Sequence, residues 1–230
     1  MKIAADFSQR VVAHIDSLEW AKSPIKGVDR KVLDRVGGEV ARATTIVRYA
    51  PGSVFSPHVH SGGEEFIVLD GIFQDEHGDF PVGSYIRNPP QSKHQPGSEK
   101  GCVIFVKLWQ FQPADRTHIR TQTNLINSIP HKHFSGLSIT PLYKDEFEEV
   151  SLLHFEPAAE ITIDAKAGAE LLVLEGEVND QDDTLVKHSW LRSPINSAIK
   201  VKAGKGGAKV WLKTGHLIDV ENQISRVQNA

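Results

Sequence analysis

The sequence predicts an all-β protein made of two similar domains in tandem. Short segments rich in β-branched and aromatic residues alternate with Gly, Pro, Asn and Asp, and no stretch predicts a helix of more than about two turns. The chain has 230 residues, enough for one large domain or two ordinary ones. Because its second half repeats the first, two domains are favoured.

The repeat has a constant offset, since Gly168 lies 105 residues after Gly63 and later matches keep that distance without a gap. The matched pairs include Glu65 with Glu170, Gly71 with Gly176, Asp75 with Asp180, Arg87 with Arg192 and Pro89 with Pro194. We therefore expect residues 1–112 to form an N-terminal arm and the first domain, and residues 113–230 a linker and the second domain. The polar stretch from Pro113 to Ser128 is interpreted as that linker.

Composition narrows the classes of partner. The chain has 26 basic and 29 acidic residues, a net charge of -3, so no electrostatic signature for nucleic acid or an acidic membrane is present. The single cysteine, Cys102, excludes an internal disulfide and suits a reducing compartment. Because no apolar run is long enough for a signal peptide or a membrane helix, we expect a cytoplasmic protein.

A candidate metal site begins at His58 and His60, which are two residues apart and so share one face of a predicted strand. The turn-forming Ser61-Gly62-Gly63 follows, and a hairpin there would return Glu64 beside the two imidazoles. Histidine nitrogens and a carboxylate are typical transition-metal ligands. His94, from a later segment, is predicted to be the fourth ligand.

All four candidate ligands are absent from the second repeat. The equivalent residues are aliphatic, namely Ile163, Ala165, Ala169 and Ile199. Buried histidines and a carboxylate without a metal would carry a large desolvation cost, which apolar side chains remove. We therefore expect one metal site, in the first domain, and an apolar interior in the second.

Two stretches resemble the motifs of the cupin family. The first motif, Gly-x5-His-x-His-x3-Glu-x6-Gly, fits at Gly52, His58, His60, Glu64 and Gly71. The second keeps Gly83, Pro89 and His94 but has Gln91 and Ser98 where the family has glycine and asparagine. From about Trp20 to Phe111 the amino-acid sequence is similar to that of the ChrR-type cupin domain, the metal-binding part of a bacterial anti-sigma factor. The resemblance implies two cupin (jelly-roll β-barrel) domains in tandem.

The ligand set predicts one divalent transition metal. Three imidazoles and a carboxylate suit tetrahedral Zn²⁺, which we favour, but they also suit Fe²⁺, Mn²⁺ or Ni²⁺ with positions open for other ligands. Phe66, Val68 and Tyr85 are predicted to line the pocket around the metal.

The sequence leaves two main functions open, besides a storage or scaffold role in which the metal would be structural. By resemblance to ChrR, the chain would be a regulatory, stress-sensing module with a sigma-factor system or a small molecule as its partner. The alternative is a metal-dependent dioxygenase or isomerase acting on a small diketone or aromatic ketone. We place regulation first because the large apolar residues beside the ligands include no charge that could anchor a substrate. Whether the chain is an enzyme, and whether it forms a homodimer, is left open.

Overall fold

The computed structural model describes residues 1–230 and divides into two compact β units, as the repeat predicts. Unit 1 comprises Met1–Ala5, Glu19–Leu125 and Glu221–Ala230, and unit 2 comprises Asp6–Leu18 and Ile126–Val220. Each unit is described by itself below. No helix in the chain has both the length and the apolar character needed to cross a membrane.

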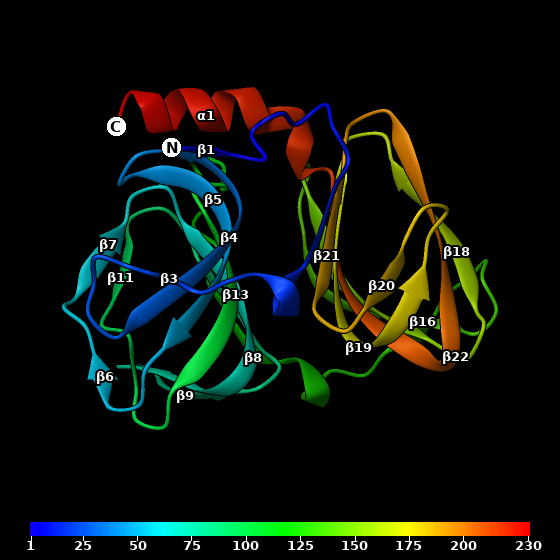
Figure 1. Ribbon diagram of the computed structural model, residues 1–230, viewed down its shortest axis with the longest axis horizontal. Coiled ribbons are helices and arrows are strands. Elements are labelled where there is room, and N and C mark those ends of the chain that lie inside the picture. The colour runs from blue at the N-terminus through cyan, green and yellow to red at the C-terminus, as the bar shows by residue number, and fades with distance from the viewer. The chain divides into compact units, whose positions relative to one another are not determined.

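Unit 1 contains one 11-stranded sheet and a separate two-stranded sheet (Figure 1). The large sheet follows the order β1-β4-β5-β13-β8-β10-β14, while β7 pairs only with β11. The bounds are β1 (Lys2–Ile3), β3 (Ala21–Lys22), β4 (Val28–Gly37), β5 (Ala41–Tyr49), β6 (Ser53–Val54), β7 (His58–His60), β8 (Glu64–Asp75), β9 (Gly78–Pro81), β10 (Ser84–Asn88), β11 (Ser92–His94), β12 (Gly97–Ser98), β13 (Cys102–Leu108) and β14 (Ile119–Gln122).

The interior of unit 1 is formed by alternate residues of its long strands. Phe66 and Val68 of β8 are each about 1% exposed and belong to one apolar cluster. Their cross-strand partners, Ile86 of β10 and Ile104 of β13, lie in the same cluster. Because side chains alternate between the two faces of a strand, these positions fix which face of each strand points inward.

Unit 2 contains a nine-stranded sheet in the order β15-β16-β17-β22-β19-β21-β2. Its elements are β2 (Val11–His14), η1 (Ile15–Ser17), β15 (Ile129–Pro130), β16 (Leu137–Lys144), β17 (Glu149–Phe155), β18 (Glu160–Ala165), β19 (Ala169–Asn179), β20 (Thr184–Val186), β21 (Ser189–Ser193), β22 (Ser197–Thr214) and η3 (His216–Asp219). Its register matches that of unit 1: Ile163 is paired with Ile199, as His58 is with His94.

The predicted linker between Pro113 and Ser128 is corrected by the structure. It contains strand β14 and a short 3-10 helix, η2 (Thr123–Leu125), and β14 pairs with β10 at the end of the unit 1 sheet. The segment Ile119-Arg-Thr-Gln is too polar to indicate a strand, but β10 supplies its hydrogen-bond partners. In unit 2, β2 pairs with β21 in the equivalent way.

A C-terminal helix, α1 (Val220–Gln228), was not expected from the sequence. Within unit 1, the buried Gln223 accepts a hydrogen bond of 2.8 Å from Arg42 Nε, and Arg42 also forms an ion pair of 3.1 Å with Asp34. Only Val220, Gln223 and Val227 of the helix are buried. Three such positions over nine residues are too short a pattern to predict a helix from sequence.

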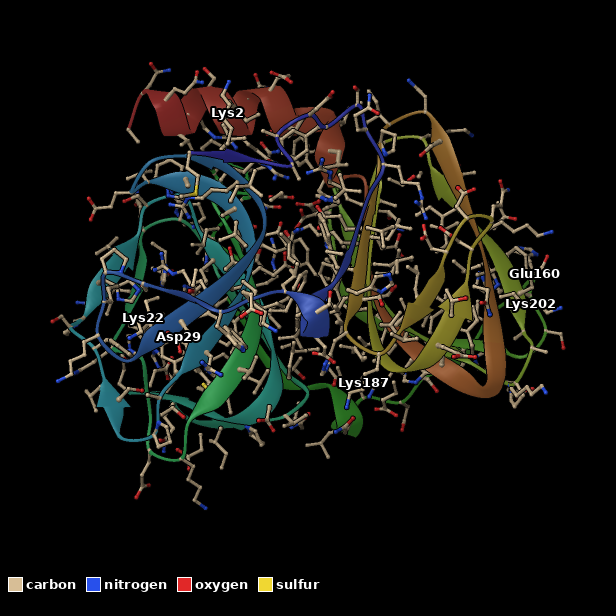
Figure 2. All side chains as sticks on the ribbon, viewed as in Figure 1. Lys2, Lys22, Asp29, Glu160, Lys187 and Lys202 are labelled. Carbon is tan, nitrogen blue, oxygen red and sulfur yellow. The ribbon has the colours of Figure 1, made fainter.

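Charged side chains stand on the outside of both units (Figure 2). Lys22 of β3 is the register partner of Asp29 of β4, and Glu160 of β18 is the partner of Lys202 of β22. Opposite charges therefore lie on neighbouring strands, where Asp29 forms an ion pair of 2.6 Å with Arg48 and Glu160 forms one of 2.9 Å with Lys200. Exposed pairs of this kind stabilise a sheet by at most about 1 kcal/mol each.

Candidate metal centre

Three histidines meet on the small sheet of unit 1. His58 and His60 lie on β7, and His94 lies on β11 directly opposite His58. The three rings have centroid separations of 4.8, 5.2 and 4.7 Å, and their nearest ligand nitrogens all lie within 4.8 Å of one another. His58 and His60 share one face of β7, as their spacing predicts, and together with His94 they could bind a metal.

Glu64 joins the triad through the turn that precedes β8. Its Oε2 lies 3.4 Å from His60 Nε2 and 3.6 Å from His94 Nε2. The turn depends on Gly63, which has φ +79° and packs so closely that a Cβ would lie 2.4 Å from the Phe111 ring.

The hairpin expected between β7 and β8 does not form. β7 pairs with β11, whereas β8 pairs with β10 and β13 in the large sheet. The left-handed backbone at Gly63 redirects the chain from one sheet to the other. Glu64 still reaches the histidines because it is the first residue of β8.

The spacing of these four side chains fits a transition metal. Ligand atoms about 2.0–2.2 Å from one ion are roughly 3–3.5 Å from their neighbours, close to the two separations from Glu64. His60 Nε2 and His94 Nε2 are also buried without a hydrogen-bond partner. Buried polar atoms are rarely left unpaired, so these nitrogens are suited to metal ligation.

The other ring nitrogen is fixed in two of the histidines. His58 Nδ1 lies 3.2 Å from the carbonyl oxygen of Ser56, and His94 Nδ1 lies 3.2 Å from Asp75 Oδ2. Both oxygens are acceptors, so each Nδ1 donates and each Nε2 keeps its lone pair for a metal. Asp75 is therefore a supporting residue that spacing alone did not identify as such.

Burial and charge act differently on the two buried imidazoles. Burial lowers the pKa of His60, although the nearby carboxylate of Glu64 opposes this. Burial would also lower the pKa of His94, but the hydrogen bond to Asp75 and the charge of Glu64 outweigh it and raise that pKa. The neutral, metal-binding form is thus favoured at His60 by its surroundings.

A polar chain leads from Glu64 to an arginine that sequence reasoning missed. Asn88 Nδ2 donates to Glu64 Oε2 at 3.2 Å, and Arg120 Nη2 donates to Asn88 Oδ1 at 3.3 Å. Arg120 lies in the stretch interpreted as a linker, so its place beside the site was not expected. The sequence carried no signal for it, because the position of Arg120 depends on the pairing of β14 with β10.

The predicted pocket lining is partly corrected. Phe66 and Val68 do point into the apolar interior of unit 1. Tyr85, by contrast, is opposite Ile67 on the other face, and its hydroxyl donates to Glu65. Tyr85 is therefore not part of the lining, because alternation along β10 turns Ile86 inward instead.

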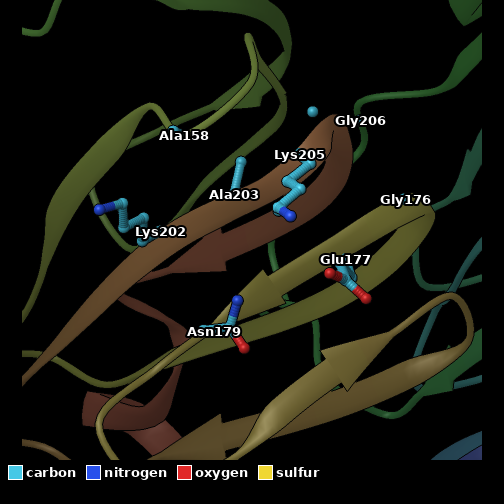
Figure 3. A pocket seen from close by; sticks show the side chains of 10 residues that line it. Ala158, Gly176, Glu177, Asn179, Lys202, Ala203, Lys205 and Gly206 are labelled. Atoms are coloured by element: carbon cyan, nitrogen blue, oxygen red, sulfur yellow. The ribbon is translucent and has the colours of Figure 1, made fainter.

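Unit 2 has an apolar interior at the equivalent positions. Its core cluster includes all four residues that replace the candidate ligands, each at most 4% exposed: Ile163, Ala165, Ala169 and Ile199. A hollow of about 670 Å³ does lie in unit 2, beside β19 and β22 (Figure 3). Its charged lining residues are Glu177, Lys202 and Lys205, and it contains no histidine or cysteine.

Comparison with known proteins agrees with this description. Residues 8–112 match the sequence profile of the ChrR cupin-like domain family. A search of curated protein sequences finds no match.

Solved structures with the same fold cover nearly the whole chain. A candidate dioxygenase from Nostoc punctiforme has a TM-score of 0.76 and 15% identity over 92% of this chain and 84% of its own. The Escherichia coli pirin YhhW in complex with nickel(II) has a TM-score of 0.63 and 14% identity over 89% and 98%. An 11S allergen from Cocos nucifera has a TM-score of 0.62 and 12% identity over 92% and 90%.

Identities this low show the fold and not the activity. The chain has the fold of tandem cupins, and its residues 8–112 match the ChrR cupin-like domain family.

Proposed function

We propose that the chain is a metal-dependent cupin enzyme that acts on a small organic molecule, with dioxygenation as the reaction class. The observation that carries the proposal is the ligand set itself. His58, His60, Glu64 and His94 offer four donors, which leave two positions of an octahedral ion for substrate and O₂. His58 is exposed, so the site is accessible from solvent on that side.

The chain's own residues would bind and shield the reactants. Fe²⁺ bound here would supply O₂ activation, the chemistry that no side chain can provide. Phe66 and Val68 keep water out of the barrel behind the ligands. Arg120, linked to Glu64 through Asn88, supplies a positive charge beside the site that could anchor a substrate.

Two of the structural relatives are consistent with this proposal, one described as a candidate dioxygenase and one as a nickel complex of pirin. These two relatives are as consistent with a redox-active metal at the site of unit 1 as with zinc. The favoured metal accordingly becomes iron if the chain is an enzyme, whereas zinc remains the expectation for a sensor.

A second candidate function is regulation in a sigma-factor system. The match of residues 8–112 to the ChrR cupin-like domain favours it. In that case the metal would serve as a sensor, and substrate turnover would not occur.

A measurement of oxygen uptake distinguishes the enzymatic function from the regulatory one. Protein reconstituted with Fe²⁺ should consume O₂ with a small diketone or hydroxyacetophenone, and His94→Ala and Glu64→Ala should abolish the uptake. Ile199→Ala, at the equivalent position of unit 2, is the matched control and should retain it. No uptake by fully iron-loaded protein with any such substrate would overturn the enzymatic proposal and favour regulation.

A further inference from the structure

We propose that Arg120 and Ser92 form a recognition site for a small carboxylate, bound beside the metal. This inference rests on the proposed metal-dependent function and names its substrate class. It adds a small organic anion to the neutral ketones that the sequence suggested.

Arg120 points toward the site from the end of the sheet. Its register partner is Ile86 of β10, which is in turn paired with Phe66 of β8. Direct cross-strand partners share a face, and both Ile86 and Phe66 are interior residues, so Arg120 also faces inward. β14 is the last strand of the sheet order, and the side chain of Arg120 is partly exposed there.

The guanidinium has capacity left for a ligand. Arg120 Nη2 donates to Asn88 Oδ1, but Arg120 Nε is buried without a hydrogen-bond partner. A guanidinium presents its N–H groups as a planar fork that matches the two oxygens of a carboxylate. One donor of that fork is therefore buried and still unused.

Ser92 is a second polar group left without a partner. It lies on β11 directly opposite His60 and two residues before His94, so it shares the face of the three histidines. Its hydroxyl is buried with no hydrogen-bond partner. In unit 2 the equivalent Ser197 is satisfied by Ser193 and by the carbonyl of Pro194.

Unit 2 lacks an arginine at the place that Arg120 occupies in unit 1, as it lacks the metal ligands. The residue of β2 that occupies the place of Arg120 is Val12, which is paired with Leu191 as Arg120 is with Ile86. Asn88 is likewise replaced by Ser193. The arginine and the metal ligands therefore occur together in unit 1, and both are absent from unit 2.

Charge balance favours an anion. Three neutral imidazoles and the carboxylates of Glu64 and Asp75 balance the charge of a divalent metal, and Arg120 adds one positive charge. A net positive charge in a partly buried site favours an anionic ligand. A short 2-oxo or 2-hydroxy acid fits, because its carboxylate can pair with Arg120 while its second oxygen is free to face the metal.

Calorimetric titration of the metal-loaded protein with pyruvate tests the inference, with pyruvamide as the neutral control. Pyruvate should bind and pyruvamide should bind at least tenfold more weakly. Arg120→Gln should weaken pyruvate binding about 10–100-fold, with Arg120→Lys in between, as expected for loss of a charge-assisted pair. Arg10→Gln, an arginine of unit 2 that pairs with Asp180, is the control and should bind as the wild type does.

The outcomes are distinguishable. If Arg120 only balances the charge of Glu64, Arg120→Gln will lower metal affinity but leave pyruvate affinity at saturating metal unchanged, and the inference is wrong. Equal binding of pyruvate and pyruvamide, or none of either to fully loaded protein, would also overturn it. Arg120-dependent pyruvate binding without any O₂ uptake would uphold the carboxylate site while refuting the proposed dioxygenase.

Discussion

Asp75 should control metal affinity through His94, although it does not contact the metal position itself. Its side chain is about 1% exposed, and its two oxygens have different partners: Oδ2 accepts from His94 Nδ1 at 3.2 Å and Oδ1 from the His77 backbone N–H at 2.7 Å. Asparagine has a single acceptor oxygen and cannot satisfy both donors. In Asp75→Asn the amide NH₂ would face one of them, and at His94 this favours the tautomer with hydrogen on Nε2.

Asp75→Asn should lower the metal affinity by about 10–100-fold, or about 1.4–2.7 kcal/mol, which is typical for loss of one supporting hydrogen bond to a metal ligand. Competition titration against a chromophoric chelator measures it. Asp180→Asn, at the repeat-equivalent position, loses an ion pair with Arg10 instead and should leave metal affinity unchanged. Wild-type affinity in both Asp75→Asn and Asp75→Ala would refute the supporting role of Asp75.

Three further changes test the fold around the site. Ile199→Ala should destabilise unit 2 by about 2–5 kcal/mol in denaturant unfolding, because a buried aliphatic side chain is lost, while metal content stays at the wild-type level. Gly63→Ala should cost about 1–3 kcal/mol and weaken metal binding, since φ +79° and the Phe111 ring leave no room for a Cβ; unchanged affinity would contradict this account of the turn. Burial would raise the pKa of Asp180, but the hydrogen bond from Arg10 outweighs it, so the pKa of Asp180 is lowered in the folded protein. The contribution of Asp180 to the stability of the fold is therefore present above its ordinary pKa of 3.8 and is lost as the pH falls through the lower pKa of the folded protein. Arg10→Ala should therefore move acid unfolding, followed by circular dichroism, to higher pH.

Much of the site could be predicted from the sequence because three of its four candidate ligands are close together in the chain. His58, His60 and Glu64 lie within seven residues, so strand alternation and one glycine turn determine their arrangement. The repeat added a second, independent criterion, since it distinguishes residues needed for the fold from those lost with the site.

What could not be predicted depends on pairing between distant segments. Arg120 belongs to a strand whose hydrogen bonds come from β10, more than 30 residues earlier, and its own sequence is too polar to indicate burial. Tyr85 was placed on the wrong face because the register of β10 against β8, which turns Ile86 inward, is set by the whole sheet. Helix α1 was missed for a similar reason, as only three of its residues are buried.

Metal stoichiometry tests the central claim most directly. Elemental analysis of protein purified without added metal should give one divalent transition metal per chain, and His58→Ala combined with His94→Ala should reduce it to near zero. Ile163→Ala combined with Ile199→Ala changes the equivalent pair of unit 2 and should leave the single metal in place. Full metal occupancy in the double histidine variant, or two metals per wild-type chain, would contradict the assignment of one metal centre to unit 1.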